Sequence, residues 1–328
     1  MNLTESRCIG SIVGLAVGDA IGYPAEFRRR AQILAEIGDE GIHDFIALKD
    51  PRFSRPFFTG PDHPPGTFTD DTQMSIAVAE SLLSADGGDL DEIMEEMSRR
   101  FVAWAGSSDN NRAPGGACMQ GCENLFRGVA WREAGVPDSK GCGSAMRVAP
   151  IGLFYDDLDW VAEVARASTM LTHGHPAALD AAAAAALMVA IALQNGTPQQ
   201  MYEEIEKRCC DSSVDFAATW RKIPAMLTLP PEQVLTENVL GEGWVAEEAV
   251  ASALYCCWRS PDDYSAAVLS AINTDGDSDS IGAITGSVMG ARLGINSIPA
   301  KWREGVESSS YLHDLGSRLW QRRGSRPI

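Results

Sequence analysis

Two rows of glycine constrain how this chain can fold. A spacing of four residues recurs in two places, at Gly10, Gly14, Gly18 and Gly22 and at Gly282, Gly286 and Gly290. In an α-helix this spacing keeps the residues on one face. A glycine face costs up to roughly 1 kcal/mol of helix propensity per residue, unless another backbone approaches it. We therefore expect helices that pack unusually closely, a feature of packing that carries no chemistry by itself.

Helical periodicity dominates the rest of the chain. Apolar residues recur at i, i+3, i+4 and i+7 in segments 9–22, 72–85, 89–105, 160–171, 177–194, 198–210, 246–259, 262–272 and 280–293. Sustained alternation of apolar and polar residues, the pattern of a half-buried strand, is absent. The longest stretches without periodicity are 38–70 and 106–147, both rich in Gly, Pro and Asp. The sequence predicts an all-α fold, a single compact orthogonal multi-helix domain over residues 1–328 with long loops that carry the functional site.

Acidic residues outnumber basic ones by 45 to 27 among 328 residues, which gives a formal net charge of −18. Such a surface repels polyphosphate, so general binding to nucleic acid is not expected. A ligand with phosphate groups must be met locally, by backbone N–H groups, single arginines or bound cations. Most of the charge is interpreted as a solubilising surface, but carboxylates are also the ligands that hard cations take.

Eight cysteines in 328 residues are too few for a disulfide scaffold. The chain has no C-x-x-C motif, so neither a zinc ribbon nor a thioredoxin-like site is indicated. The apolar N-terminal stretch is interrupted by Asp19, no signal-cleavage pattern follows it, and no run approaches the roughly 20 apolar residues of a membrane span. We expect a soluble, cytoplasmic protein that does not bind membranes.

The first acidic motif is GTFTDDT, from Gly66 to Thr72, directly before a predicted helix. Asp70, with Gln73 three residues later, resembles a helix-capping box, although capping needs only one such residue. Four consecutive oxygen-bearing side chains that include two adjacent carboxylates repel each other unless a cation gathers them. A helix cap and a metal site are both open interpretations of this motif.

The second acidic motif is NTDGDSDS, residues 273–280. Three aspartates stand at alternate positions in it, Asp275, Asp277 and Asp279. Their oxygens can turn to one centre, as Ca²⁺ or Mg²⁺ requires. An EF-hand is excluded, because Ser280 takes the place of the required glycine and Gly286 the place of the bidentate glutamate. A haloacid-dehalogenase-type D-x-D would follow a strand of a parallel sheet, which this sequence lacks. A compact acidic cluster at a helix start remains, with metal binding one of two open interpretations.

Two weaker motifs also carry polar groups. Residues 18–26 end the first predicted helix and contain Asp19 and Glu26, which could equally cap a helix, pair with an arginine or lie on the surface. Residues 141–147, GCGSAMR, form a glycine-rich loop that can present backbone N–H groups to phosphate. This loop is not a dinucleotide-binding fingerprint, because Met146 stands at the last glycine position.

A histidine pair, His173 and His175, stands in the segment THGHP. Two imidazoles with no third ligand nearby in sequence are weak evidence for zinc. Pro176 suits the first position of the alanine-rich helix that follows, so one of the imidazoles could simply cap that helix.

These segments occur together in one order, and that order resembles the ADP-ribosylglycohydrolase family. The resemblance covers about residues 8 to 300. It is carried by GLAVGDAIGYPAEF, GTFTDDTQM, RAPGGAC, GCGSAMRVAPIGLFY, THGHPAA and NTDGDSDSIGAITGSVMGA.

The resemblance implies an all-α fold with two Mg²⁺ or Mn²⁺ ions at the bottom of a cleft. By position, it implies that Thr69, Asp70 and Asp71 ligate one ion and that Asp277, Asp279 and Ser280 ligate the other. Asp279 would bridge the ions, and Glu26 matches a glutamate that reaches the same centre. Ser280 stands where most members carry Thr, which keeps the hydroxyl ligand.

The resemblance also implies a substrate site. The residues that would cradle a diphosphate and the distal ribose are Gly141, Cys142, Gly143, Ser144, Met146 and Arg147. His173 and His175 would line the cleft, and Asp109 falls, on a loose alignment, where some members carry a cleft aspartate. Cys142 replaces an Asn that is common in this loop.

The implied activity is removal of ADP-ribose from modified targets, most of all by cleaving the N-glycosidic bond to arginine. Glu26, Asp70 and Asp279 would be the catalytic carboxylates. The implied partner is an ADP-ribosylated protein, small molecule or nucleobase. Three alternatives stay open: a relative that binds ADP-ribose without turnover, a hydrolase of serine-, threonine- or nucleobase-linked ADP-ribose, and a metal phosphohydrolase that attacks the diphosphate.

Overall fold

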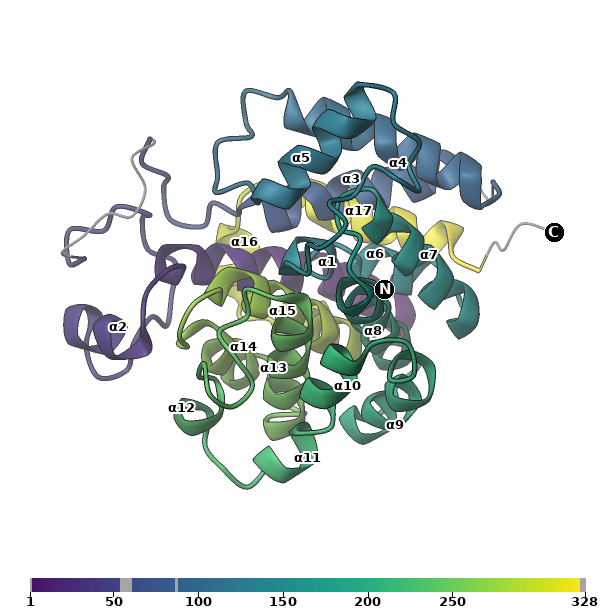
Figure 1. Ribbon diagram of the computed structural model, residues 1–328. Coiled ribbons are helices and arrows are strands. Elements are labelled where there is room, and N and C mark those ends of the chain that lie inside the picture. The colour runs from purple at the N-terminus through teal and green to yellow at the C-terminus, as the bar shows by residue number, and fades with distance from the viewer. Residues whose placement is uncertain (1, 54–60, 86–87, 325–328) are drawn as a thin grey trace.

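The computed structural model describes residues 2–53, 61–85 and 88–324. Within these ranges the chain is helical and forms no strand, only isolated bridges (Figure 1). The helices are α1 (Leu3–Gly22), α2 (Arg30–Ile37), α3 (Asp70–Ala85), α4 (Leu90–Ala105), α5 (Gly116–Phe126), α6 (Ala149–Phe154), α7 (Leu158–Met170), α8 (Pro176–Leu193), α9 (Pro198–Cys209), α10 (Val214–Trp220), α11 (Ile223–Met226), α12 (Pro231–Val234), α13 (Ala246–Arg259), α14 (Tyr264–Ile272), α15 (Ser278–Leu293), α16 (Ala300–Gly305) and α17 (Ser309–Arg322). The predicted all-α fold in one compact domain is confirmed.

The two glycine rows face each other, and they make α1 and α15 the most closely packed helix pair. A Cβ atom added at Gly18 would lie 2.0 Å from the carbonyl oxygen of Gly282. The same construction puts a Cβ of Gly286 at 2.1 Å from the oxygen of Gly14 and a Cβ of Gly290 at 2.0 Å from the oxygen of Gly10. The helices therefore run antiparallel, and their backbones are in contact. The close approach is the one that the glycine spacing predicted.

This antiparallel pairing decides where the acidic motifs meet. The C-terminal end of α1 lies against the N-terminal end of α15, where a Cβ at Gly22 would lie 2.6 Å from the Cα of Asp279. Glu26 follows α1 after the short 3₁₀ turn Tyr23–Ala25. Motifs about 250 residues apart in the chain are thus brought to one end of the helix pair.

Helix α8 forms a second buried wall and packs on α6, α7, α9, α13 and α15. Its run of alanines is buried throughout, which allows this close packing on several sides. The segments Leu3–Ala25 and Pro176–Leu193 are long and apolar enough to cross a membrane by length and composition alone, closer to a span than the sequence analysis allowed. Both are almost wholly buried inside the fold, as core helices are.

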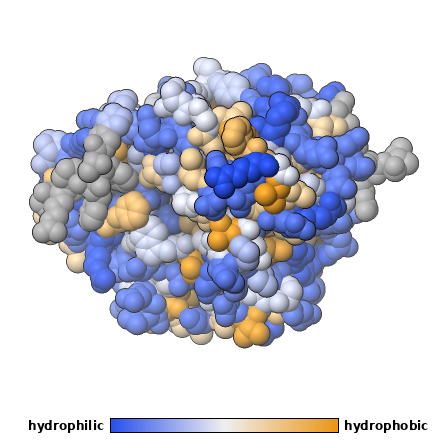
Figure 2. All heavy atoms as spheres, turned by 45° about the horizontal axis from the view of Figure 1, so that its top comes forward, coloured by the Kyte–Doolittle hydropathy of each residue, from blue (hydrophilic) through white to orange (hydrophobic). Residues whose placement is uncertain are grey.

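The remaining helices surround this centre. In Figure 1, α3, α4 and α5 form the upper part of the molecule, and α9 to α13 lie in the lower part. The face shown in Figure 2 is largely hydrophilic, with apolar residues scattered among polar ones. All eight cysteines are free, in keeping with the prediction that the chain is no disulfide scaffold.

Two boundaries differ from the sequence prediction in a way that matters for the site. Helices α3 and α15 begin at Asp70 and Ser278, earlier than residues 72 and 280, so the acidic residues lie in the first helical turns. The prediction that 106–147 is irregular is wrong for Gly116–Phe126, which forms α5. The glycines of this segment lower its helix propensity, so the sequence does not indicate a helix there. One of them, Gly121, is required by packing, because a Cβ at this position would lie 2.4 Å from the carbonyl oxygen of Leu171.

Candidate active site

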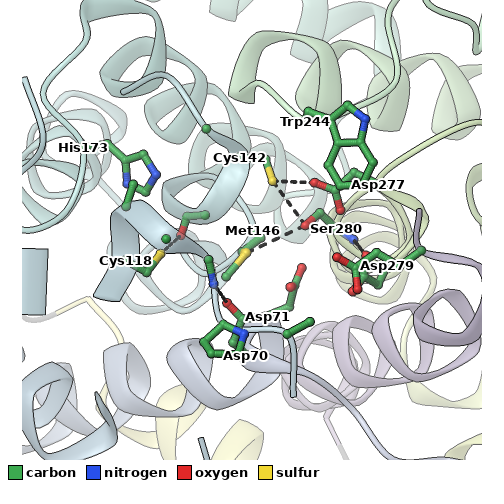
Figure 3. Close-up of a pocket in the computed structure, with 18 of the residues that line it drawn as sticks. Asp70, Asp71, Cys118, Cys142, Met146, His173, Trp244, Asp277, Asp279 and Ser280 are labelled. Carbon is green, nitrogen blue, oxygen red and sulfur yellow. Dashed lines mark hydrogen bonds between the residues drawn. The ribbon is translucent and has the colours of Figure 1, made fainter. Parts of the chain in front are cut away.

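A cavity of about 400 Å³ opens where α3 and α15 begin (Figure 3). Both acidic motifs contribute to its wall, together with the residue after the α1 turn. The acidic and hydroxyl side chains that line it are Glu26, Asp70, Asp71, Asp277, Asp279 and Ser280. The structure therefore brings the two predicted ligand groups and Glu26 together in one pocket.

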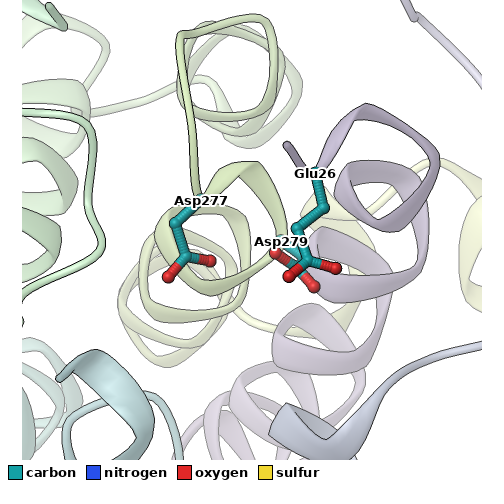
Figure 4. Close-up of side chains that lie close together, drawn as sticks. All are labelled: Glu26, Asp277 and Asp279. Carbon is teal, nitrogen blue, oxygen red and sulfur yellow. The ribbon is translucent and has the colours of Figure 1, made fainter. Parts of the chain in front are cut away.

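Three of these carboxylates are close enough to share one cation (Figure 4). Glu26, Asp277 and Asp279 each offer an oxygen, and these oxygens all lie within 4.8 Å of one another. Glu26 Oε2 and Asp71 Oδ1 are buried and have no hydrogen-bond partner. A buried carboxylate oxygen without a hydrogen-bond partner raises the free energy of the folded protein. A hard divalent cation would remove this cost, and the pocket offers the oxygen ligands that such a cation prefers.

Burial and mutual repulsion raise the pKa values of these carboxyl groups. Burial raises the pKa of Asp70 to about 8. The hydrogen bond that Gly115 N–H donates to this carboxylate opposes the shift, because it favours the charged form. Burial and the charge of Asp277 raise the pKa of Glu26 well above its ordinary value, and burial and the charge of Glu26 do the same for Asp279. Because each negative charge disfavours ionisation of its neighbours, the groups favour protonated forms without a cation.

Asp19 caps α3 from another helix. Its carboxylate accepts hydrogen bonds from the backbone N–H groups of Thr69 and Thr72 and from both threonine hydroxyls. The capping box proposed between Asp70 and Gln73 is wrong, because the Gln73 side chain binds Trp104 and a backbone carbonyl instead. Asp19 thus frees the carboxylate of Asp70 to face the cavity.

Thr69, a predicted metal ligand, is fully buried and does not line the cavity. Its hydroxyl lies 2.9 Å from Asp19 Oδ1 and 3.1 Å from Asp71 Oδ2. In this arrangement Thr69 connects the cap to the acidic cluster.

The loop that carries Glu26 is fixed to the second acidic motif. Phe27 N–H donates to the carbonyl of Gly276, and Gly276 N–H donates to the carbonyl of Arg28. Asp275 turns away from the cavity and accepts a hydrogen bond of 2.7 Å from Arg30 N–H at the start of α2. Only two of the three alternating aspartates therefore point to the pocket.

The glycine-rich loop contributes Gly141, Cys142, Gly143 and Met146 to the cavity wall. Cys142 lies beside the acidic cluster, and burial, with the charge of Asp277, raises the pKa of its thiol well above the ordinary value. Ser144 is buried and is not part of the wall.

Arg147 does not face the cavity, contrary to the prediction that it holds a diphosphate. Its guanidinium is fully buried over the ring of Phe101, 4.6 Å from the centroid. It donates to the carbonyls of Gly143 and Ser168 and to the hydroxyl of Thr172, at 2.8 to 2.9 Å. Arg147 supports the glycine-rich loop and the histidine segment from behind.

The two histidines have different places. His173 lines the cavity, and its Nδ1 lies 2.7 Å from the hydroxyl of Thr172. Burial lowers the pKa of His173 to about 3, with Arg147 acting in the same direction, so the ring is neutral. His175 lies outside the wall and caps α8, because its Nδ1 accepts a hydrogen bond from Ala177 N–H. The capping alternative is confirmed for His175.

Asp109 is exposed and lies outside the cavity wall. The nearby segment 113–118 does line the cavity and was not named as a site by sequence reasoning. Arg112 holds this segment, since its guanidinium donates to Glu307 and to the carbonyl of Phe68. In the sequence, this segment is marked only by the family-like motif RAPGGAC.

An aromatic pair at the cavity was also missed. Phe27 and Trp244 stack with ring centroids 4.9 Å apart, and both line the cavity. Phe27 adopts a left-handed backbone conformation, with φ of 63°. No periodicity or motif distinguishes Trp244 in the sequence, so only the tertiary structure reveals its place.

The raised pKa values predict how stability depends on pH. A carboxyl group whose pKa is higher in the folded state stabilises the fold below its unfolded pKa and loses that contribution as the pH rises through the folded value. For Asp70 this window runs from 3.8 to about 8. We expect the protein in chelator to lose thermal stability across this window, and Mg²⁺ or Mn²⁺ to restore it most at the alkaline end. Thermal unfolding followed over pH, with and without the ion, checks this. Identical profiles in both conditions would contradict it.

The fold and the cavity together define an all-helical protein whose carboxylates, from three separate segments, converge on one pocket. The sequence matches the ADP-ribosylglycohydrolase family model over residues 1–327, longer at both ends than the motifs that suggested the resemblance. The chain belongs to the ADP-ribosylglycohydrolase family, and its prediction as an ADP-ribosyl hydrolase is confirmed at the level of that family.

Individual relatives and a solved structure are similar to this chain over most of its length. An Archaeoglobus fulgidus protein, whose name states no function, is 32% identical over 97% of both chains. The ADP-ribosylarginine hydrolase Tri1 of Pseudomonas putida is 26% identical over 96% of this chain and 78% of its own length. A solved structure described as an ADP-ribosylglycohydrolase-related protein complex superposes with a TM-score of 0.75 at 25% identity, covering 98% of this chain and 99% of its own.

Proposed function

We propose that this protein is a divalent-cation-dependent hydrolase that removes ADP-ribose by cleaving its N-glycosidic bond to arginine. The observation that carries the proposal is the convergence of Glu26, Asp70, Asp71, Asp277 and Asp279 on one cavity, with buried oxygens that lack partners. The arginine linkage is supported by similarity to a protein named an ADP-ribosylarginine hydrolase, with which the chain aligns over 96% of its length.

The donor set fits the two Mg²⁺ or Mn²⁺ ions that the family resemblance implies. Asp70 and Asp71 would hold one ion, with Thr69 behind them, and Asp277 and Ser280 the other, with Asp279 between the two. Bound there, the ions would fix the ribose hydroxyls and acidify a water molecule. They would also offset the repulsion between an acidic pocket and a diphosphate.

The chain's own groups supply the remaining chemistry. Glu26, with a free buried oxygen at the cavity, is the carboxylate placed to take a proton from the attacking water. Asp70 is the second candidate for this role. Gly141 and Gly143 border the cavity without side chains, so their backbone can approach a diphosphate closely. His173, as a neutral ring on the wall, can hydrogen-bond substrate without adding charge.

A relative that binds ADP-ribose without turnover is the competing proposal. Loss of cluster carboxylates would favour that alternative, and here every one of them is present and faces the cavity. Retention of the full acidic set therefore favours catalysis.

The decisive assay uses proteins ADP-ribosylated on arginine, serine or glutamate, each incubated with the enzyme and Mg²⁺ or Mn²⁺. We expect free ADP-ribose from the arginine-linked substrate and none in excess chelator. Full release in chelator contradicts metal dependence, and release from the serine-linked substrate alone contradicts the linkage. Phosphate or AMP among the products would identify a phosphohydrolase, and binding measured by calorimetry without any turnover would favour the non-catalytic alternative.

A further inference from the structure

Cys142 carries a sulfur atom into the acidic pocket (Figure 3). Its Sγ lies 2.7 Å from Asp277 Oδ2 and 3.4 Å from Ser280 Oγ. Donor atoms that share one ion at bond lengths of 2.0 to 2.3 Å are themselves roughly 3 to 3.6 Å apart. The sulfur therefore lies within a few tenths of an ångström of the spacing expected of a third donor beside Asp277 and Ser280.

A second observation, independent of the cysteine, points to a cation in the same place. Glu26 is only 7% exposed, and its Oε2 has no hydrogen-bond partner although it lies at the cavity. Glu26 also shares the 4.8 Å cluster with Asp277, the residue that Cys142 contacts. The space beside Cys142 Sγ is therefore bordered by buried carboxylate oxygens of Glu26 and Asp277, which a bound cation would stabilise.

We propose that Cys142 Sγ is a ligand of the divalent cation held by Asp277 and Ser280, and that it makes this half of the centre select first-row transition ions over Mg²⁺. The inference rests on the metal centre of the proposed function and narrows its choice of ion. When the sulfur–metal bond forms, the S–H bond breaks and its proton passes to water. No electron is transferred.

The selectivity follows from the chemistry of the donor. Mg²⁺ is a hard ion that takes oxygen ligands in near-ideal octahedral geometry. Sulfur is a soft donor that Co²⁺ and Zn²⁺ accept far better than Mg²⁺ does, whereas Mn²⁺, the hardest of the first-row divalent ions, gains least from it. A site with carboxylate, hydroxyl and thiolate donors therefore disfavours Mg²⁺ relative to a site of oxygen ligands alone.

Cobalt gives a readout that does not depend on activity, because a thiolate bound to Co²⁺ produces a near-ultraviolet charge-transfer band. We would titrate Co²⁺ into the full-length, metal-free protein and into Cys142→Ser and Cys142→Asn. We expect the band in the wild type and its loss in both variants. The matched control is Cys118→Ser, since Cys118 also lines the cavity but contacts the carbonyl of Gly143 instead of a carboxylate. That variant should keep the band.

The affinities for Co²⁺ and Mg²⁺, measured by calorimetry, give the second readout. Indirect partners of a metal already contribute 10- to 100-fold to affinity, so we expect loss of a direct sulfur ligand in Cys142→Ser to lower the preference for Co²⁺ over Mg²⁺ by about tenfold or more. Co²⁺ that binds the wild type without the band, or a band unchanged in the variants, overturns the role of Cys142 and leaves the proposed function standing. If no divalent ion binds the wild type, both proposals fail together.

Discussion

Replacing Asp279 by asparagine is expected to abolish release of ADP-ribose while the helical fold stays intact. The carboxylate offers an oxygen within 4.8 Å of oxygens of Glu26 and Asp277, and it is close enough to Asp71 for that charge to help raise its pKa. Its loss removes a charge from both proposed ion positions, and even indirect partners of a metal typically contribute 10- to 100-fold to affinity or activity, so we expect at least about a hundredfold loss. In chelator, by contrast, the stability of the Asp279→Asn variant should not fall below that of the wild type. Burial and the charge of Glu26 raise the pKa of Asp279 well above its ordinary value, so its charge does not stabilise the metal-free fold.

The same motif supplies the control. Asp275→Asn changes an aspartate that stands outside the pocket, and an amide oxygen can still accept the hydrogen bond from Arg30 N–H. We expect this variant to keep its activity. The two variants would be compared by release of ADP-ribose, by Mn²⁺ affinity and by circular dichroism. Wild-type activity in Asp279→Asn would remove Asp279 from the catalytic centre.

The second large effect is on stability, and it comes from Gly18→Ala. The added methyl group would lie 2.0 Å from the carbonyl oxygen of Gly282, so α1 and α15 would have to move apart. Overpacking of a core costs about 1 to 3 kcal/mol, and we expect the upper end of that range because the obstacle is backbone, which cannot rotate away. Moving these helices apart also separates Glu26 from Asp279, so cation affinity should fall together with stability.

Gly106→Ala is the matched control for this substitution. Gly106 directly follows α4 as its C-cap with φ of −88°, and apart from its chain neighbours the nearest atom to an added Cβ is 3.7 Å away. We expect urea unfolding to show a change within about 0.5 kcal/mol for Gly106→Ala. Equal stability of the Gly18→Ala and Gly106→Ala variants would mean that the glycine contact is not needed for the fold.

Local patterns in the sequence predicted much of the architecture. The helices with strong periodicity and the close packing of the glycine faces were anticipated, because both depend on spacing within a single helix. Helix α5 was missed, since Gly116 and Gly121 lower its helix propensity and its stability comes from packing against the segment around Leu171.

For the site, too, the sequence predicted local features but not the directions of the side chains. The acidic motifs could be recognised as helix starts with an excess of oxygen ligands, but the direction of each side chain could not. Asp275 and Asp277 are two residues apart, yet one binds the start of α2 and the other faces the cavity. Arg147 was expected to meet a phosphate and instead holds carbonyl groups in the interior.

The sequence by itself determined the helices that have a clear apolar periodicity, the faces by which α1 and α15 pack, and the kinds of ligand atom available, because these follow from residue type and spacing along one element. Only the tertiary structure decided which carboxylates share a cavity, that Asp19 caps α3, and that Trp244 and Cys142 border the acidic cluster. The physical reason is that these contacts join segments far apart in the chain, for example 50 residues apart between Asp19 and Thr69 and 135 residues apart between Cys142 and Asp277, and their geometry is set by how whole helices pack.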